Sequence, residues 1–463
     1  MPVPVAGLVS LIPFGLGALL MTVAFWLYYR LRLVTGKLLS YTGLISFWLG
    51  YEYLHQTWDL SFPWMNLGNA FSNFHQIIQW YEFTGVYGGT LWVWIANILA
   101  FEILLSRSDS AMLPYRKKLA VALAVVIILP VLYSLTIYTN YKEETNPANI
   151  VVVQPNIDPY SKFGGIPVSQ QIQSLIHLSD SAGQSNTEYF VWPETAISEY
   201  VEEGRVQQNI SYLMVTQFLG KYKNGNVLSG ISSYSVYSSA KTPSSYYSQS
   251  FGSYIDEYNA AIQIENSSRV QFYHKSKLVP GVELIPFSAL SFLRPIFAGF
   301  GGGGSYGSQK EPSVFYSQSG IGASPVICYE SVWGDWVAKS VKNGAQFIAI
   351  VTNDAWWGNT SGKDQHFLYA RLRAIETRRW IARSANTGIS GFINQRGDIT
   401  QKSGWWQATA LKEDINLNEE ITFYTRYEDL IAILASVISG VLLVFLLFKK
   451  LNNPHAKRLA LNR

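Results

Sequence analysis

Long uncharged apolar stretches lie toward both ends of the chain, and a mixed polar region separates them. A helix needs about 20 predominantly apolar residues to span a bilayer. Segments that meet this requirement lie at about 5–28, 39–58, 85–105, 119–138 and 430–448. The first lacks the basic flank and small-residue cleavage site of a secretory signal, so we interpret it as a retained span. The pattern predicts four N-terminal spans, a central insert and one C-terminal span.

Short apolar runs alternate with amphipathic segments throughout the insert. Buried strands are expected at 150–154, 189–192, 227–234, 259–265, 270–274, 325–328 and 346–351, and helices at 170–178, 206–222, 332–341 and 366–385. A last hairpin is expected from 389–394, turning at Gly397-Asp398. The Ser- and Tyr-rich stretch 232–253 is interpreted as a loop, and the Gly-rich stretch 297–309 as a loop or a lid. The alternation indicates an α/β domain with its site in the polar loops at strand ends.

The positions of lysine and arginine orient the spans, because short cytoplasmic loops carry an excess of both. Basic residues cluster at 30–37, at 107–118 and in the tail after 449, whereas none lies between Lys37 and Arg107. This distribution places the insert outside the cytoplasm and the tail inside it. The predicted organisation is 1–145, N-terminal membrane helices; 146–427, extracytoplasmic domain; 428–449, C-terminal membrane helix; and 450–463, basic cytoplasmic tail.

Composition limits the chemistry. Charged residues make up 14% of the chain, well below the roughly 25% of globular proteins. The basic loops and tail account for the net charge of +4, so it does not indicate nucleic-acid binding. The sequence contains no phosphate-binding glycine motif and no metal-ligand spacing. We therefore expect no metal, no cofactor and no nucleic-acid partner.

Three reactive side chains follow predicted strands: Glu194, Lys275 and Cys328, the only cysteine. Acyl transfer through a thiol needs a base, a cation or N–H groups for the oxyanion, and a nucleophile that can leave again. These residues fit those requirements. Taken singly, they have ordinary alternatives: a helix-capping acid, a solvated strand end and a small buried hydrophobe.

The chain carries Trp192-Pro193-Glu194, then Tyr273-His274-Lys275, then Ile327-Cys328-Tyr329-Glu330. These three motifs, in this order, resemble those of the nitrilase superfamily. A nitrilase-like domain held between membrane spans resembles the apolipoprotein N-acyltransferase family. This likeness extends to Phe62-Pro63-Trp64, Val153-Gln154-Pro155-Asn156, Leu278-Val279-Pro280 and Thr352-Asn353-Asp354-Ala355-Trp356-Trp357-Gly358, with His366 and Arg373 in the helix that follows. The resemblance implies an α-β-β-α sandwich inserted between transmembrane helices.

The resemblance also implies roles for other residues. Glu283 supports the lysine and the base, and Tyr329 and Glu330 shape the pocket beside the nucleophile, a structural ion pair being the competing account for Glu330. Asn353, Trp356 and Trp357 are candidates for substrate binding.

The implied reaction transfers an acyl chain from a phospholipid donor, through a cysteine thioester, to a diacylglyceryl apolipoprotein. It requires no cofactor, and the enzyme is expected as a monomer in the bacterial cytoplasmic (inner) membrane, with its catalytic domain in the periplasm. The alternatives are a membrane-anchored amidohydrolase, in which water replaces the amine, and an inactive lipid-binding protein. An intact triad argues against the latter.

The chain departs from the family in two places. It has Pro280-Gly281-Val282-Glu283 where members commonly have Pro-Phe-Gly-Glu, which leaves the register of the acid open. It also has four spans before the domain where the family usually has more. Since the charge distribution puts Met1 outside, the spans missing relative to the family should be even in number, and a shortened start and a naturally reduced version would look the same.

Overall fold

The computed structural model describes residues 3–108, 113–287 and 306–451. Most of the predicted lid at 297–309 lies outside these residues. The chain divides into two compact units. One contains Met1–Phe71, Thr84–Tyr133 and Asp429–Arg463, and the other contains Ser72–Phe83 and Ser134–Glu428.

The first unit is helical. Its long helices are α1 (Val3–Arg32), α2 (Lys37–Thr57), most of α3 (Tyr81–Leu105) and α4 (Leu113–Asn140), and α12 (Leu430–Leu451). Within the described residues, four segments are long and apolar enough to cross a membrane: Pro13–Arg32, Tyr81–Leu105, Leu113–Asn140 and Leu430–Lys450. The predicted span at 39–58 forms α2, which is not among these four.

Helix α2 packs against α1 and α12 and buries polar side chains. Its Glu52 accepts hydrogen bonds from Trp48 Nε1 at 3.0 Å, the backbone N–H of Leu67 at 3.0 Å and Thr90 Oγ1 at 2.8 Å. A buried carboxylate is tolerated only when such partners replace water. Glu52 thereby ties α2 to α3 and to the 3₁₀ segment that begins at Leu67.

The second unit contains two β-sheets. The first has the order β14-β1-β2-β4-β6-β5, with β3 paired to β4 and β7 paired to β6. Its strands are β1 (Pro147–Gln154), β2 (Thr187–Val191), β3 (Ile197–Glu202), β4 (Asn226–Tyr237), β5 (Tyr246–Ser248), β6 (Ser253–Glu265), β7 (Val270–His274) and β14 (Thr409–Asn416). The second sheet has the order β13-β12-β11-β10-β9-β8. Its strands are β8 (Phe315–Tyr316), β9 (Gly322–Ile327), β10 (Phe347–Thr352), β11 (Ile381–Ala385), β12 (Gly391–Ile393) and β13 (Ile399–Lys402).

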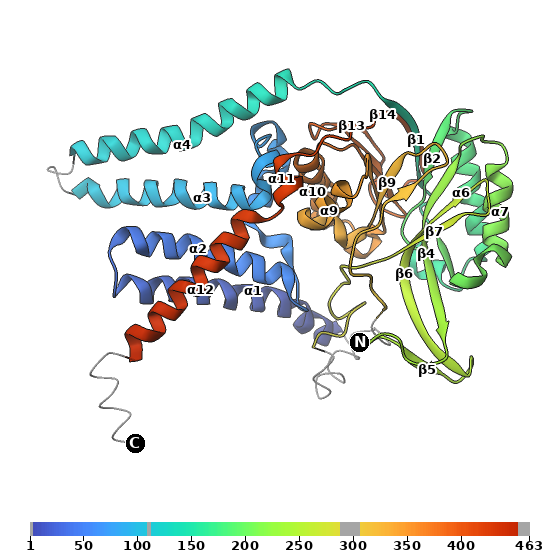
Figure 1. The fold of residues 1–463 in the computed structure, drawn as a ribbon, viewed down its shortest axis with the longest axis horizontal. Helices are drawn as coiled ribbons and strands as arrows, with labels where there is room; N and C mark the ends of the chain where they lie inside the picture. Colours follow the sequence, from blue (N-terminus) through green and yellow to red (C-terminus); the bar gives the residue numbers. More distant parts are fainter. Residues whose placement is uncertain (1–2, 109–112, 288–305, 452–463) are drawn as a thin grey trace. The chain divides into compact units, whose positions relative to one another are not determined.

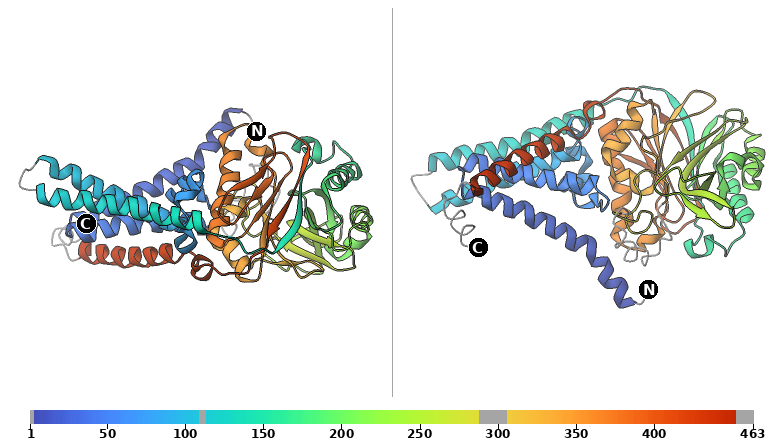
Figure 2. Two further views of the ribbon diagram at one scale, coloured as in Figure 1. Left: turned by 90° about the horizontal axis from the view of Figure 1, so that it is seen from above. Right: turned by 60° about the horizontal axis from the view of Figure 1, so that its bottom comes forward.

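Helices cover the outer face of each sheet. Helices α6 (Val168–Ala182) and α7 (Ile210–Leu219) lie on the first sheet, and α9 (Gly334–Lys342) and α10 (Ser361–Thr377) lie on the second (Figures 1 and 2). Strands β1 and β11, and β4 and β10, meet between the sheets. The predicted α-β-β-α sandwich is confirmed. The central strands β1 and β10 are almost entirely buried because parallel strands are covered on both faces.

Several predicted elements were wrong in extent. The expected helix at 366–385 ends at Thr377, because Arg378 adopts a left-handed conformation with φ of 50°. The chain then forms β11, which is fully buried and pairs in parallel with β10. The expected helix at 206–222 consists of a 3₁₀ segment (Glu203–Gln208) followed by α7. Part of the expected loop at 232–253 forms strands, namely the end of β4, all of β5 and the first residue of β6, and irregular segments at 238–245 and 249–252 connect them.

Candidate active site

Glu194 lies in a tight turn after β2. The N–H of Trp192 still bonds to the carbonyl of Leu228 on β4 at 2.8 Å, and Pro193 then ends the ladder. The glutamate is buried, with 7% of its surface exposed. Its Oε1 accepts hydrogen bonds from Asn259 Nδ2 at 2.8 Å and from Lys275 Nζ at 3.3 Å. The carboxylate is thus held at the carboxyl end of a parallel strand, as the sequence predicts.

Lys275 is shared between two carboxylates. It follows β7, and its N–H bonds to the carbonyl of Asn259 on β6 at 2.9 Å. Its ammonium group contacts Glu283 Oε1 at 2.9 Å as well as Glu194, and it is 1% exposed. Asn259 Nδ2 bridges the same two oxygens, donating to Glu283 at 2.8 Å. Burial opposes the charge on Lys275, but Glu283 and Glu194 hold its pKa well above the ordinary value.

Cys328 occupies a strained elbow directly after β9. Its φ of 50° lies in the left-handed region, which costs a residue other than glycine about 1–3 kcal/mol. The elbow turns the chain from the strand into a short 3₁₀ segment, Cys328–Val332. The residue is partly exposed. Its thiol therefore lies at the carboxyl end of a parallel strand, as does Glu194.

The charges around the thiol oppose one another. Burial and Glu194 raise the pKa of Cys328 and Lys275 lowers it, and the net result is a pKa of about 12. The sulfur therefore rests as a neutral thiol that needs a base to take its proton. A cysteine stabilised as a thiolate would instead have a pKa below its ordinary value.

A buried ionic cluster supports the elbow from behind. Cys328 O lies 2.8 Å from Ser331 Oγ and 3.1 Å from His366 Nε2. On its other side, His366 Nδ1 lies 2.9 Å from Asp354 Oδ1, and Asp354 Oδ2 accepts from Arg383 Nη2 at 2.8 Å. Burial opposes the charge on Asp354, but Arg383 and His366 lower its pKa to about 2. These contacts fix the backbone that the nucleophile requires.

Glu330 connects the strand of the nucleophile to the strand of the lysine. Its Oε2 accepts from the N–H of Ile327 at 2.8 Å, and its Oε1 accepts from Tyr273 Oη at 2.5 Å and from the N–H of Ser276 at 2.7 Å. Burial raises the pKa of its carboxyl group. Glu330 thus accepts hydrogen bonds on both carboxylate oxygens, and Lys275 acts on it electrostatically. Its neighbour Tyr329 is buried with its ring edge-on to Trp333, at 4.5 Å between centroids.

The three remaining candidates lie after β10. Asn353 is buried, and its Oδ1 accepts from Thr387 Oγ1 at 3.2 Å, so it secures the loop. Trp356 and Trp357 are 64% and 37% exposed. Trp356 meets the ring of Tyr160 edge-on at 6.1 Å. The two indoles provide an apolar surface, whereas the Oδ1 of Asn353 accepts hydrogen bonds from the protein.

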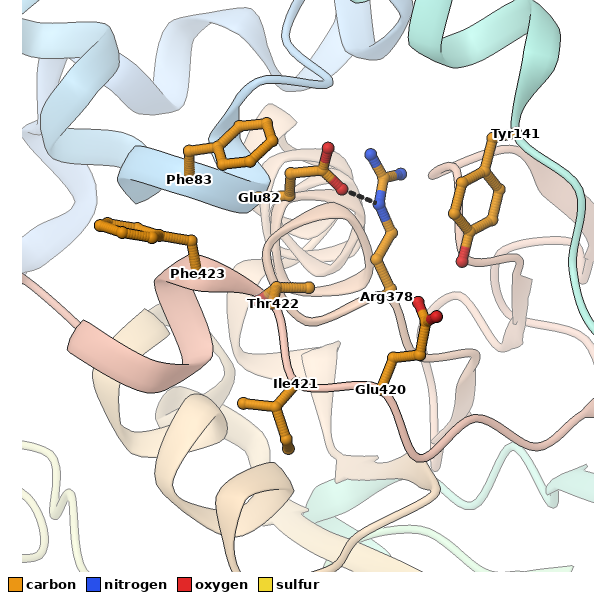
Figure 3. Close-up of a pocket in the computed structure, with 8 residues that line it drawn as sticks. All are labelled: Glu82, Phe83, Tyr141, Arg378, Glu420, Ile421, Thr422 and Phe423. Atoms are coloured by element: carbon orange, nitrogen blue, oxygen red, sulfur yellow. Dashed lines mark hydrogen bonds and ion pairs between the residues drawn. The ribbon is translucent and has the colours of Figure 1, made fainter.

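A cavity of about 390 Å³ lies elsewhere in this unit (Figure 3). Arg378 lies on its wall, paired with Glu82 at 2.6 Å and stacked on Tyr141 at 4.6 Å. The lining includes none of Glu194, Lys275 and Cys328, so the cavity is separate from the triad. Within the described residues, no group of three or more His, Cys, Asp or Glu side chains could hold a metal ion.

The sequence did not reveal Asn259 or the roles of Asp354, His366 and Arg383. Asn259 was noted only as the start of a predicted strand. The sequence feature that could have indicated a role for Asn259 is an amide at the polar end of a mostly apolar run. Asp354 and His366 belong to the motifs of the sequence, but Arg383 falls within the predicted helix at 366–385 and in fact lies on β11.

Matches to known families agree with the fold and this arrangement. The family model for carbon-nitrogen hydrolase matches residues 150–423, which defines the class of the catalytic unit. The model for the apolipoprotein N-acyltransferase N-terminal domain matches residues 1–99. The chain belongs to the apolipoprotein N-acyltransferase family, and it is therefore an acyltransferase. The apolar helices and the family fit a protein of the bacterial inner membrane.

Two relatives illustrate the match. The chain is 30% identical over 427 residues to the apolipoprotein N-acyltransferase of Chlorobaculum tepidum, covering 90% of this chain and 78% of the relative. It is 27% identical over 425 residues to that of Geobacter metallireducens, covering 89% and 75%. Among solved structures, an amidase of the nitrilase superfamily from Nesterenkonia covers 62% of this chain and 96% of its own, with 13% identity and a TM-score of 0.41.

Proposed function

We propose that this acyltransferase moves a fatty acyl chain from a membrane phospholipid to the N-terminal α-amine of the diacylglyceryl-cysteine of apolipoproteins, through a thioester on Cys328. The observation that carries the proposal is the buried Lys275, which is held between Glu194 and Glu283 and interacts electrostatically with Cys328, the only cysteine. The relatives' names supply the acceptor. The neutral resting thiol makes a neighbouring base necessary.

In the first half-reaction, Glu194 takes the proton from Cys328 Sγ as the sulfur attacks an ester carbonyl of the phospholipid, which we assign to the sn-1 chain. The ammonium group of Lys275 stabilises the oxyanion, together with a backbone N–H near Tyr329. The C–O bond then breaks, Glu194 returns the proton to the departing alkoxide, and a lysophospholipid leaves. The thioester remains.

In the second half-reaction, the α-amine of the apolipoprotein attacks the thioester carbonyl. Glu194 accepts a proton from the amine and delivers it to the sulfur as the C–S bond breaks. An amide forms and the thiol is regenerated, so the cycle needs no external reductant or energy source. Glu283 and Asn259 hold Lys275 and Glu194 in place throughout.

Membrane anchoring suits these two substrates, since both are lipids. Extracting a two-chain phospholipid into water would expose on the order of thirty CH₂ groups at about 0.8 kcal/mol each. A site at the bilayer surface avoids this cost, because the acyl tails stay in hydrocarbon. The exposed Trp356 and Trp357 are suited to such a surface. We propose a monomer whose catalytic unit lies on the periplasmic side.

The proposal is tested by trapping the acyl-enzyme. Purified protein in detergent is incubated with phospholipid carrying a labelled sn-1 chain, and the label on the protein is measured before and after hydroxylamine treatment. We expect a hydroxylamine-sensitive label that passes to a diacylglyceryl lipopeptide when one is added. Cys328→Ala and Cys328→Ser should carry no label.

The outcomes separate the candidate functions. A wild-type chain that never acquires label contradicts the transferase. A label that is discharged at the same rate with or without lipopeptide indicates that water is the acceptor, and the protein is then a membrane-anchored hydrolase. Lys221→Met is a matched control because it removes a surface lysine that pairs with Asp180, and it should label like the wild type.

A further inference from the structure

A second buried lysine contacts the residue proposed as the base. Lys162 ends the short helix α5 (Pro159–Lys162) and is 2% exposed. Its ammonium group donates to the backbone carbonyl of Glu194 at 2.9 Å and to Thr195 Oγ1 at 2.7 Å. Lys275 contacts the carboxylate of the same glutamate. The proposed mechanism gives Lys162 no part.

The turn that Lys162 contacts is tight and strained. Thr195 has a φ of 47°, a conformation that costs a β-branched residue of order 1–3 kcal/mol. The turn presses against β4 at Gly230, where an added Cβ would lie 2.4 Å from the nitrogen of Thr195 and 2.5 Å from Cα of Glu194. Such a turn persists only if its surroundings determine it. Lys162 supplies two hydrogen bonds for that purpose.

Lys162 is itself held in place. Asp158 caps the start of α5, accepting from the N–H groups of Tyr160 at 2.9 Å and Ser161 at 3.1 Å. Gln171 Nε2 donates to the carbonyl of Lys162 at 2.8 Å. The backbone is thereby fixed before the side chain reaches the turn.

Space filling does not explain a lysine at this position. Burial lowers the pKa of Lys162 to about 7, against the opposing effect of Glu194, so the charged side chain bears a desolvation cost. Methionine has a similar length and would fill the same space without that cost. What lysine adds is a set of N–H donors aimed at Glu194 O and Thr195 Oγ1.

We propose that Lys162 is a positioning residue for acyl-enzyme formation: its two hydrogen bonds to the Glu194–Thr195 turn keep the glutamate carboxylate directed at the thiol of Cys328. The inference rests on the proposed role of Glu194 as the base. It requires the hydrogen bonds and not merely the volume of the side chain.

The test compares substitutions at both ends of one hydrogen bond. Single-turnover acylation of the purified full chain is measured with labelled phospholipid at increasing lipid concentrations. For Lys162→Met we expect the maximal rate to fall about 10- to 100-fold, the range for a slightly misplaced catalytic group, with the half-saturating lipid concentration unchanged. Thr195→Val should show a smaller loss, and Thr195→Ser should recover the rate to within about twofold.

Each outcome decides the matter. The inference is overturned if Lys162→Met is acylated at the same maximal rate as the wild type. It is also overturned if the maximal rate of Thr195→Ser is as low as that of Thr195→Val. If Lys162→Met fails to fold, as judged by its thermal unfolding, the two Thr195 variants decide alone. Absence of label on the wild-type chain overturns the proposed function itself, and this is measured first.

Discussion

The thiol of Cys328 lies among charges that work against each other. Burial and the carboxylate of Glu194 raise its pKa, whereas the ammonium group of Lys275 lowers it, and the result is a pKa of about 12. Lys275 therefore does not keep Cys328 as a thiolate in the resting enzyme. It is placed instead to stabilise negative charge that appears during the reaction, after Glu194 has taken the proton.

This balance predicts the pH dependence of thiol alkylation. Only the thiolate reacts, so the rate with neutral iodoacetamide should rise about tenfold per pH unit from pH 7 to 10, without a plateau near the ordinary thiol pKa. Lys275→Met removes the one nearby charge that lowers the pKa, and it should slow alkylation at every pH in this range. The rate is measured by mass spectrometry of the peptide that contains Cys328.

A plateau between pH 7 and 9 would contradict this picture and indicate a preformed thiolate. The matched control is Lys221→Met, which removes a lysine exposed on the same unit and should leave the rate unchanged. Thermal unfolding of Lys275→Met is followed in parallel, because it leaves Glu194 and Glu283 buried without their cation.

At the scale of elements, the nucleophile depends on three neighbours packed behind it. Arg383 on β11 pairs with Asp354 after β10, Asp354 contacts His366 on α10, and His366 contacts the carbonyl of Cys328. The carboxylate of Asp354 therefore links β10, β11 and α10. Its protonation should weaken all of these contacts together.

The depressed pKa of Asp354 predicts a loss of stability in acid. Its folded-state pKa of about 2 lies below its ordinary value of 3.8. The stabilisation is therefore fully present above about pH 4 and is lost as the pH falls toward 2, about 2 kcal/mol in all. Asp354→Asn should lower the free energy of unfolding at pH 7 by about 3–5 kcal/mol, because Arg383 is left without its anion.

Denaturant unfolding of the purified protein at pH 7, 4 and 3 measures both effects. The variant should lose less further stability between pH 4 and 3 than the wild type does. An equal loss in the two proteins would mean that other carboxylates account for the acid sensitivity. Asp180→Asn, at a surface pair with Lys221, is the control and should change stability by less than about 1 kcal/mol.

The strands that carry the triad could be predicted because each is a mostly apolar run that ends at a polar motif. Strands β2, β7 and β9 were found this way. The boundary between α10 and β11 was missed, since the change from helix to strand is set by the left-handed Arg378 and by pairing with β10. Strand β14 was missed because its charged, half-exposed sequence lacks a buried run. Asn259 was missed because only the sheet register brings it to Lys275.

At the scale of the whole molecule, the predicted topology remains to be tested. Cys328→Ala yields a chain without cysteine, into which single cysteines can be introduced. Ser239→Cys, exposed on the catalytic unit, should react with a membrane-impermeant maleimide in intact spheroplasts. Lys117→Cys, in the first turns of α4 on the side predicted to be cytoplasmic, should react only after permeabilisation.

Gel shifts with a maleimide-linked polymer report the labelling. Reaction of Lys117→Cys before permeabilisation, or protection of Ser239→Cys, would reverse the predicted orientation. The cysteine-free parent chain is the control for non-specific labelling.

The pairing of β1 with β14 has a mechanical consequence. The two strands are antiparallel from Pro147↔Asn416 to Gln154↔Thr409, so the chain enters and leaves the catalytic unit at the same end of one ladder. Tension applied through the flanking membrane helices therefore loads these hydrogen bonds one pair at a time, beginning at Pro147, and does not shear them together. The first strand to come away would be β14, because it lies at the edge of the sheet and pairs only with β1. Strand β1 would stay paired on its other edge with β2, the strand that leads to Glu194.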